Sequence, residues 1–190
     1  VPGRGTLFAA PFAKYIAISY DEALQYFPKN VHFKIVLTGN PVRKDIQKPA
    51  LQGAFEFLDL DPSVPVVVFL GGSLGAESLN NLVLDALPDL LQKYQVIHQT
   101  GEPHFNSVNA MSQVILGKQE TRFRYKVFPF LSTLALKMTA GAAGLIVSRA
   151  GSGSIAELAI WGRPSILIPI PVDVSRDQRL NAFAYARTGA

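Results

Sequence analysis

Runs of apolar residues alternate with amphipathic segments over most of the chain, and this alternation predicts its secondary structure. Residues 64–70 are apolar without polar alternation, which is typical of a parallel strand buried on both faces. The next segment carries one apolar stripe at helical spacing, made of Leu79, Leu82, Val83, Leu87, Leu90 and Leu91. Further strands are predicted at 95–99, 125–130, 144–148 and 165–169, and further helices near 106–116, 132–140, 154–161 and 177–187. Strands separated by helices predict βαβ units and therefore a doubly wound, Rossmann-like α/β fold with a parallel sheet.

The first sixty residues are less regular. We predict a helix over 7–14, strands over 15–19 and 33–37, and a helix over 44–58. Asn40-Pro41 marks a turn, because a proline disfavours helical geometry in the residue before it. We place a domain boundary at this turn. Residues 1–42 hold two strands, too few for a domain of their own, and residues 43–190 form most of a second α/β domain, so we expect an excerpt of a longer two-domain protein.

Composition narrows the classes of function. Of the 190 residues, 48% are hydrophobic and 17% are charged, so the chain can bury a core. There is no cysteine, which excludes disulfides, thiolate metal sites and a cysteine nucleophile. No apolar run reaches the roughly 18 residues that a membrane-spanning helix needs. The net charge of +4 comes from scattered Lys and Arg, which argues against a nucleic-acid partner but suits an anionic membrane surface or a diphosphate substrate.

The segment from Ser148 to Glu157 is the strongest candidate for a binding site. A predicted strand ends here in small residues and a helix follows, so backbone N–H groups at the helix start lack intrahelical partners. These donors and the positive end of the helix dipole suit a phosphate or diphosphate. Glu157, about one turn into the helix, could accept both hydroxyls of a ribose. The alternative is that Ser152 or Ser154 is an ordinary helix cap and Glu157 a solvated acid.

Gly71-Gly-Ser-Leu-Gly-Ala76 is a second glycine-rich turn between a strand and a helix. It lacks the lysine of a P-loop and the spacing of the GxGxxG dinucleotide motif. Ser73 could donate to a phosphate, whereas the alternative is a tight turn that only needs glycine conformations. Two such turns at the carboxyl ends of strands in one sheet favour a ligand site, because ligands of open α/β sheets bind at the switch point.

Polar side chains also begin the last predicted helix. Gln178 and Asn181 are three residues apart and share a helix face that suits the hydroxyls of a sugar, although a polar helix start alone explains them as well. No metal site is predicted. We interpret Asp59-Leu60-Asp61 as a helix terminus and turn, and the stretch with His98 and His104 as a surface loop rather than a zinc site.

These motifs together resemble the MurG family of glycosyltransferases, family 28. The resemblance rests on six ordered motifs: Thr38-Gly-Asn-Pro-Val-Arg43, Gly71 to Ala76, His98-Gln-Thr-Gly101, Ser148 to Glu157, Gly162-Arg-Pro-Ser165 and Gln178-x-x-Asn181-Ala182. It covers essentially the whole chain. It implies a GT-B architecture, in which two Rossmann-like domains face a cleft, and transfer of N-acetylglucosamine from UDP-N-acetylglucosamine to lipid I in peptidoglycan synthesis.

The resemblance also implies roles for individual residues in donor binding. Ser152, Gly153 and Ser154 would hold the diphosphate, in a stretch that continues through Ile155 and Ala156 to Glu157, which would hold the ribose. Backbone atoms at Leu131 would bind the uracil, and Gln178 the sugar. Arg43 and Ser73 match donor-binding positions at the interdomain cleft. No cofactor and no metal are implied. The lipid I acceptor would bind through the N-terminal domain, with peripheral contact to the cytoplasmic face of the bacterial inner membrane.

The chain departs from the family pattern at several points. The Gly-Gly-x-Gly-Gly-His loop, which carries the family's proposed catalytic base, is not among these residues. Leu74 stands where glutamine is common, and Arg176-Asp177 replace a frequent histidine. We therefore assign no catalytic residue to this chain and expect it to be inactive alone. The alternatives are another GT-B enzyme for UDP-sugars, such as a lipid glucosyltransferase or an epimerase, and a non-catalytic UDP-sugar-binding protein.

Overall fold

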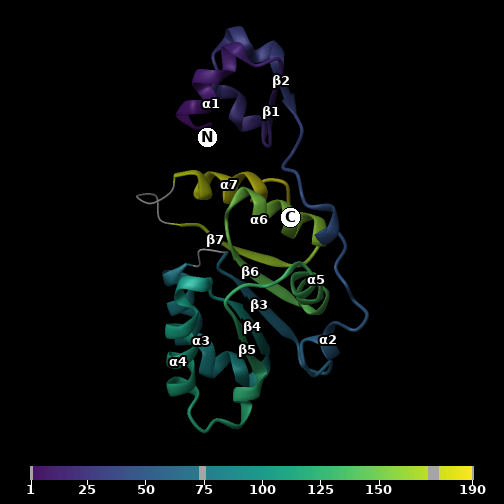
Figure 1. Cartoon of the computed structure of the whole chain (residues 1–190), viewed down its shortest axis with the longest axis vertical. Coiled ribbons are helices and arrows are strands. Elements are labelled where there is room, and N and C mark those ends of the chain that lie inside the picture. The colour runs from purple at the N-terminus through teal and green to yellow at the C-terminus, as the bar shows by residue number, and fades with distance from the viewer. Residues whose placement is uncertain (1, 73–75, 171–175, 190) are drawn as a thin grey trace.

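The computed structural model describes residues 2–72, 76–170 and 176–189 (Figure 1). Within these residues the strands form two sheets, one of two strands and one of five. The small sheet pairs β1 (Ile16–Ile18) with β2 (Ile35–Leu37) in parallel. It is accompanied by α1 (Arg4–Ala9) and by short 3-10 turns, and we call residues 2–37 the N-terminal unit.

The larger sheet has the strand order β5-β4-β3-β6-β7, and every neighbouring pair is parallel. Its strands are β3 (Val66–Leu70), β4 (Gln95–Gln99), β5 (Tyr125–Phe128), β6 (Leu145–Arg149) and β7 (Ser165–Ile168). The helices between and after them are α3 (Glu77–Lys93), α4 (Phe105–Leu116), α5 (Thr133–Ala142), α6 (Ser152–Trp161) and α7 (Arg176–Ala186). The prediction of a parallel, doubly wound α/β sheet is therefore confirmed.

The central strand β3 is buried on both faces, as its unbroken apolar sequence predicts. Val66 and Val68 pack into one core cluster, which includes residues of α5 and α6. Val67 and Phe69 point the other way and pack against the apolar stripe of α3. Figure 1 shows this layering, with α3 and α4 on one side of the sheet and α2 (Ala54–Phe57) and α5 on the other. Burial on two faces holds the carboxyl end of β3 in a fixed position.

The predicted helix over 44–58 is wrong. Lys44–Ile46 form one 3-10 turn, and only Ala54–Phe57 form a helix, α2. Two residues account for the difference. Pro49 has no N–H to donate and disfavours helical geometry in the residue before it. Gly53 has a φ of 74°, in the left-handed region, so it separates α2 from the preceding chain.

Several element ends also differ from the predictions, and proline explains two of them. The helix predicted at 7–14 is α1 at Arg4–Ala9, followed by a 3-10 turn at Ala10–Phe12 that contains Pro11. The strand predicted at 125–130 ends at Phe128, immediately before Pro129. In contrast, Asp59-Leu60-Asp61 does form a helix terminus and turn, as predicted. Asp59 has a φ of 52° after α2, and Asp61 accepts hydrogen bonds from Ser63.

The irregular segment between the two sheets is bound to the α5 and α6 side of the larger one. The indole N–H of Trp161 donates to the Ile46 carbonyl at 2.7 Å, and the Ala50 N–H donates to the Lys137 carbonyl. Gly141 allows this contact, because a Cβ there would lie 1.8 Å from the Ala50 carbonyl oxygen. The chain entering the larger sheet, including Arg43, is thus held beside α6.

The interpretation of His98 as part of a surface loop is wrong. His98 lies in β4 and is fully buried, with Nε2 3.0 Å from Asn80 Oδ1 and Nδ1 2.9 Å from the Tyr125 hydroxyl. Burial lowers the pKa of His98 to about 4, so the ring is neutral at physiological pH. The periodicity of residues 95–99 predicts this strand correctly. The error was to expect that the polar side chain of His98 faces solvent. A partner on each ring nitrogen makes the buried position favourable.

Candidate functional site

The two glycine-rich turns begin side by side at the carboxyl edge of the larger sheet. β3 and β6 are neighbours, with Leu70 opposite Ser148, and each strand continues into one of the turns. From β3 the chain proceeds through β4 and β5 to one edge of the sheet, whereas β6 and β7 extend to the other edge. The space between β3 and β6 is therefore the topological switch point, where open α/β sheets bind their ligands.

The start of α6 provides a row of backbone donors at this switch point. The first intrahelical hydrogen bond runs from the Ile155 N–H to the Gly151 carbonyl at 2.9 Å. The N–H groups of Ser152, Gly153 and Ser154 precede that bond and have no intrahelical acceptor. A Cβ at Gly153 would meet no atom within 4 Å, so the helix start faces open space. These three N–H groups and the helix dipole form a seat for an anion, which we call the anion seat.

The structure decides against the alternative that a serine caps this helix. The N-cap residue is Gly151, and it provides no side-chain hydrogen bond. Ser152 and Ser154 both lie inside the helix rather than before it. The donors at the helix start are thus left available to a ligand.

Glu157 and Arg43, which come from motifs more than a hundred residues apart, lie next to each other. Nη2 of Arg43 is 4.0 Å from Oε1 of Glu157, and the side chains are 56% and 27% exposed. Burial raises the pKa of the Glu157 carboxyl, and the charge of Arg43 counteracts that rise. Glu157 is therefore a partly buried carboxylate beside the anion seat, with a cation on its exposed side. Ile155 is buried, whereas Ala156 is partly exposed.

Leu131 follows β5 at the same edge of the sheet, and the whole residue, backbone included, is only 2% exposed. The residue belongs to the core cluster with Val68 and Ile146. Ser132, the next residue, caps α5 by accepting a hydrogen bond from the Ala135 N–H. In this structure Leu131 therefore contributes to the core at the edge of the candidate site.

Gln178 and Asn181 both bind neighbouring loops through their side chains. Oε1 of Gln178 accepts a hydrogen bond from the Ile170 N–H at 3.1 Å, and Nδ2 of Asn181 donates to the Ala150 carbonyl at 3.2 Å. These bonds tie α7 to the end of β7 and to the turn before α6. Asn181 thus supports the residue that precedes Gly151, which is a role that sequence reasoning did not assign to it.

Ser73 and Leu74, which the sequence analysis singled out, lie outside the described residues, as do the side chains of Arg176 and Asp177. Within the described ranges no group of three His, Asp or Glu residues could hold a metal ion. In the same ranges no helix is both long and apolar enough to cross a membrane.

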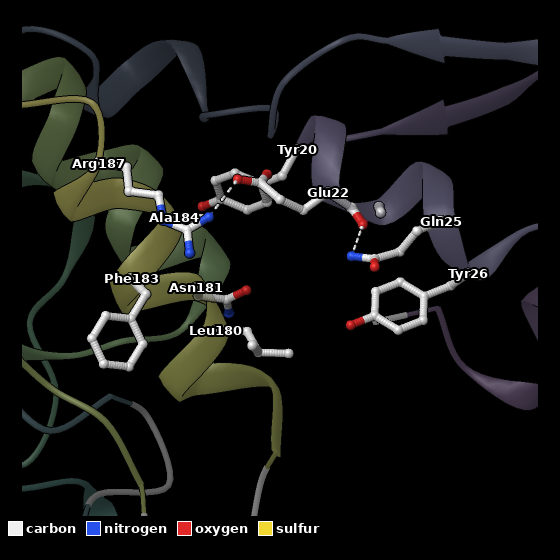
Figure 2. Close-up of a pocket in the computed structure, with 10 residues that line it drawn as sticks. Tyr20, Glu22, Gln25, Tyr26, Leu180, Asn181, Phe183, Ala184 and Arg187 are labelled. Carbon is white, nitrogen blue, oxygen red and sulfur yellow. Dashed lines mark hydrogen bonds and ion pairs between the residues drawn. The ribbon is translucent and has the colours of Figure 1, made fainter.

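Two cavities lie between the N-terminal unit and the helices α6 and α7. One, of about 260 Å³, contains Ile18, Ser19 and Tyr20 on one side and Ser152 and Asn181 on the other. The second, of about 220 Å³, lies between the turn after β1 and α7, as Figure 2 shows. The anion seat thus opens into a cleft whose far wall is the N-terminal unit.

Sequence reasoning missed the residues on the N-terminal side of this cleft. Glu22 Oε1 lies 3.8 Å from Nη1 of Arg187, the residue that follows α7, and this ion pair lies at the second cavity (Figure 2). Burial raises the pKa of the Tyr20 hydroxyl, with smaller contributions from Glu22 and Tyr185. The signal was present in the sequence, because Tyr20, Asp21 and Glu22 directly follow the predicted strand 15–19, where ligand-facing loops begin.

A parallel sheet with unpaired helix-start donors at its switch point is typical of α/β proteins that bind nucleotides. The sequence profile of the glycosyltransferase family 28 C-terminal domain matches residues 66–190. That match covers most of the chain, and the chain therefore belongs to glycosyltransferase family 28.

The chain is similar to bacterial proteins named UDP-N-acetylglucosamine–N-acetylmuramyl-(pentapeptide) pyrophosphoryl-undecaprenol N-acetylglucosamine transferase. The protein from Treponema denticola is 33% identical over 191 residues, which are 100% of this chain and 49% of that protein. One of the proteins so named in Bacillus thuringiensis (strain Al Hakam) is 35% identical over 190 residues, 99% of this chain and 50% of that protein. The chain therefore spans about half the length of these relatives.

Two solved structures share the fold. MurG of Acinetobacter baumannii superposes with a TM-score of 0.64 at 23% identity, over 100% of this chain and 49% of that one. A glycosyltransferase from Rickettsia africae gives a TM-score of 0.57 at 15% identity, over 92% of this chain and 51% of that one. These similarities confirm the predicted α/β fold of the GT-B type and the resemblance to the MurG family.

Proposed function

We propose that the chain is the donor-binding portion of an enzyme that transfers N-acetylglucosamine from UDP-N-acetylglucosamine to lipid I, giving lipid II. One observation carries the proposal: the anion seat of Ser152, Gly153 and Ser154 lies at the switch point, next to the carboxylate of Glu157. A diphosphate needs hydrogen-bond donors, and the adjoining ribose needs an acceptor for its hydroxyls. The anion seat and Glu157 are one helical turn apart and would supply both. The names of the Treponema denticola and Bacillus thuringiensis relatives describe the same transfer.

In this proposal the donor lies along the carboxyl edge of the larger sheet. The diphosphate binds the anion seat, and the ribose hydroxyls donate to Glu157. The uracil binds backbone atoms at Leu131, a residue that is buried in this structure and would have to become accessible to the base. Arg43, Ser73 and Gln178 complete the donor site, with Arg43 already beside Glu157 at 4.0 Å.

The transfer would invert the anomeric centre and need neither a cofactor nor a metal. As the bond to the sugar breaks, negative charge develops on the diphosphate of UDP. Preorganised N–H donors stabilise such developing charge best, because they need not reorient during the reaction. The seat at α6 would thus have the role that a bound metal ion has in other transferases.

Acceptor binding and deprotonation would fall to the N-terminal domain, of which residues 1–42 would be the C-terminal part. The family's proposed base lies in a glycine-rich loop ending in histidine, a motif that the 190 residues do not contain. We therefore assign no catalytic residue here. In the proposal, lipid I reaches the cleft from the cytoplasmic face of the inner membrane, which the enzyme contacts peripherally.

Exposed aromatic residues on the N-terminal unit support a membrane contact. Phe8, Phe12 and Phe33 are each at least 79% exposed. Lys34 lies over the Phe33 ring and donates to the Pro11 carbonyl, next to Phe12. Exposed rings with basic neighbours suit an anionic bilayer surface. Sedimentation with vesicles of phosphatidylglycerol should recover the chain, and Phe12→Ser with Phe33→Ser should reduce that recovery.

The nucleotide preference tests the donor assignment directly. Calorimetry should show that the chain binds UDP and UDP-N-acetylglucosamine more tightly than ADP, GDP or NAD. Equal affinities for UDP and ADP would contradict the assignment of uracil to Leu131, and no binding of any of them would contradict the donor site itself.

An assay of sugar transfer tests whether the catalytic base lies outside residues 1–190. Residues 1–190 alone should give no product with UDP-N-acetylglucosamine and a lipid I analogue, because a general base typically contributes about 10²–10⁴-fold. Supplying the acceptor-side segment of the protein in cis, or as a complementing fragment, should restore transfer. Robust turnover by the 190 residues alone would show that the base lies among them.

A further inference from the structure

Arg149 is the last residue of β6, and its guanidinium lies on the α3 side of the switch point. Nη1 of Arg149 donates to Oγ of Ser78, in the first turn of α3, at 3.1 Å. The following residues, Ala150 and Gly151, lead into the anion seat. Arg149 therefore stands between the starts of two helices, α3 and α6. Neither helix has a side-chain cap, since Ala76 and Gly151 occupy the N-cap positions.

The charge of Arg149 lacks an acidic partner in the part of the chain that the structure describes. The residue is only 8% exposed, and its buried Nε has no hydrogen-bond acceptor. No described carboxylate lies within ion-pair distance of the guanidinium, whose contact with Ser78 is to a neutral hydroxyl. Burying an unpaired cation is unfavourable, so proteins generally pair such a group with a counter-charge or a ligand.

We propose that Arg149 is a diphosphate-binding residue, whose guanidinium provides a fixed positive charge to an anion held between the starts of α3 and α6. The anion would accept from the N–H groups of the anion seat on one side and from the guanidinium on the other. The ligand class is a pyrophosphate group. That this pyrophosphate belongs to UDP-N-acetylglucosamine rests on the proposed function. That the ligand is an anion rests only on the surroundings of Arg149.

Three features of the arrangement favour a ligand over a purely structural role. A structural arginine satisfies its N–H groups with carbonyls or carboxylates, as Arg163 does by donating to the carbonyls of Ala140 and Gly141 at 3.0 Å. In Arg149, by contrast, Nη1 donates to a neutral hydroxyl and Nε has no acceptor. Only Ala150 and Gly151 separate Arg149 in the sequence from the unpaired backbone donors at the start of α6. A bound pyrophosphate satisfies both groups at once.

The experiment compares Arg149→Met with the unchanged chain, using three probes: UDP, inorganic pyrophosphate and uridine. Methionine replaces the apolar stem of the side chain and removes the charged guanidinium. A charge-assisted hydrogen bond corresponds to about a tenfold to hundredfold change in affinity. We expect Arg149→Met to weaken UDP and pyrophosphate binding by that factor and to leave uridine binding unchanged. Arg149→Lys should lie between the two.

Arg163→Met is the matched control. It removes an arginine from the amino end of β7, where the side chain bonds to backbone carbonyls far from the switch point. This variant should lower the melting temperature and leave the affinity for UDP unchanged. If Arg149→Met does not fold, the Nε–Hε NMR signal of Arg149, assigned by its loss in Arg149→Lys, should shift with pyrophosphate and UDP but not with uridine.

The outcomes separate this inference from the proposed function. Unchanged UDP affinity in Arg149→Met, an equal loss for uridine, or an Nε–Hε signal that ignores pyrophosphate would overturn the role of Arg149 while leaving the donor site in place. Pyrophosphate binding that depends on Arg149, with no preference for UDP over ADP, would support the role of Arg149 and contradict the uracil assignment.

Discussion

Arg43 and Glu157 form an ion pair at 4.0 Å across the junction of two segments that the sequence separates by more than a hundred residues. Arg43 reaches this position because Trp161 and Gly141 hold the chain after it against the α5 and α6 side of the larger sheet. Glu157 reaches it because α6 begins at the switch point. A solvent-accessible pair at this distance, with one partner half exposed and the other partly buried, contributes about 0–1 kcal/mol to stability. The ion pair therefore matters mainly for position, because it places a cation and a carboxylate together at the opening of the candidate site.

Replacing Glu157 should weaken nucleotide binding without unfolding the chain. A hydrogen bond to a charged group is typically worth about 1.5–3 kcal/mol, so Glu157→Ala should raise the dissociation constant for UDP roughly tenfold or more. Calorimetry measures the effect, and Glu120→Ala, an exposed acid in the turn before β5, is the control. A dissociation constant that stays the same in Glu157→Ala would make Glu157 a solvated helix residue.

The pH dependence of stability gives a second readout of Glu157. Its pKa in the folded chain is raised above the ordinary value of 4.5, mainly by burial. The folded chain therefore binds the proton more tightly than the unfolded chain, so this group's contribution to stability falls as pH rises from about 4.5 through the folded pKa. In Glu157→Gln that fall should disappear from urea denaturation curves measured between pH 4 and 6.5. A curve parallel to that of the unchanged chain would contradict the burial of this carboxyl.

Donor binding should persist in excess EDTA. The described residues offer no cluster of three metal-binding side chains, and the start of α6 supplies the positive potential that a diphosphate needs. Calorimetric titration of UDP should therefore give the same affinity with 5 mM EDTA and with 5 mM Mg²⁺, within about a factor of two. A strict requirement for magnesium or manganese would mean that a metal site was missed.

His98 should make the chain less stable in mild acid. Its ordinary pKa of 6.5 is lowered to about 4 by burial, so the contribution of the neutral ring is present above pH 6.5 and lost as pH falls toward 4. The shift corresponds to about 3 kcal/mol at most. His98→Gln should lower stability at pH 7 and reduce this acid dependence, whereas His104→Gln should leave the dependence intact. Denaturant titrations at several pH values distinguish the two variants.

Gly141→Ala should destabilise the chain by displacing the segment around Ala50. The new Cβ would lie 1.8 Å from the Ala50 carbonyl oxygen, so backbone must move. Overpacking of this kind typically costs about 1–3 kcal/mol. Gly5→Ala, where a Cβ would meet nothing within 4 Å, is the control and should be neutral or stabilising. Equal melting temperatures for the two variants would contradict the described path of residues 46–51.

Periodicity predicted the larger sheet well because its strands are buried on both faces and its helices carry clear apolar stripes. The chain between the sheets was predicted poorly. Residues 44–58 have helical composition, but Pro49 and Gly53 divide them, and tertiary bonds to Trp161 and Lys137 fix their path. These bonds join residues far apart in the sequence, so the local sequence does not indicate them. His98 shows the same limit, since its burial depends on Asn80 and Tyr125.

The candidate site was predictable where a motif supplies its own backbone geometry, as at Ser152 to Ser154. It was less predictable where the group depends on a distant neighbour. Nothing in the local sequence indicates that Arg43 meets Glu157 or that Asn181 bonds to Ala150. Likewise, the burial of Arg149 follows from the proximity of α3, which a strand-ending arginine does not reveal.

Helix α7 and the residue that follows it, Arg187, contact three parts of the molecule. Gln178 bonds to Ile170, Asn181 to Ala150, and Arg187 pairs with Glu22 of the N-terminal unit. A movement of that unit that separates Glu22 from Arg187 would act on the same helix whose Asn181 supports the turn before α6. Changes in the cleft and in the turn before α6 are thereby mechanically linked through α7.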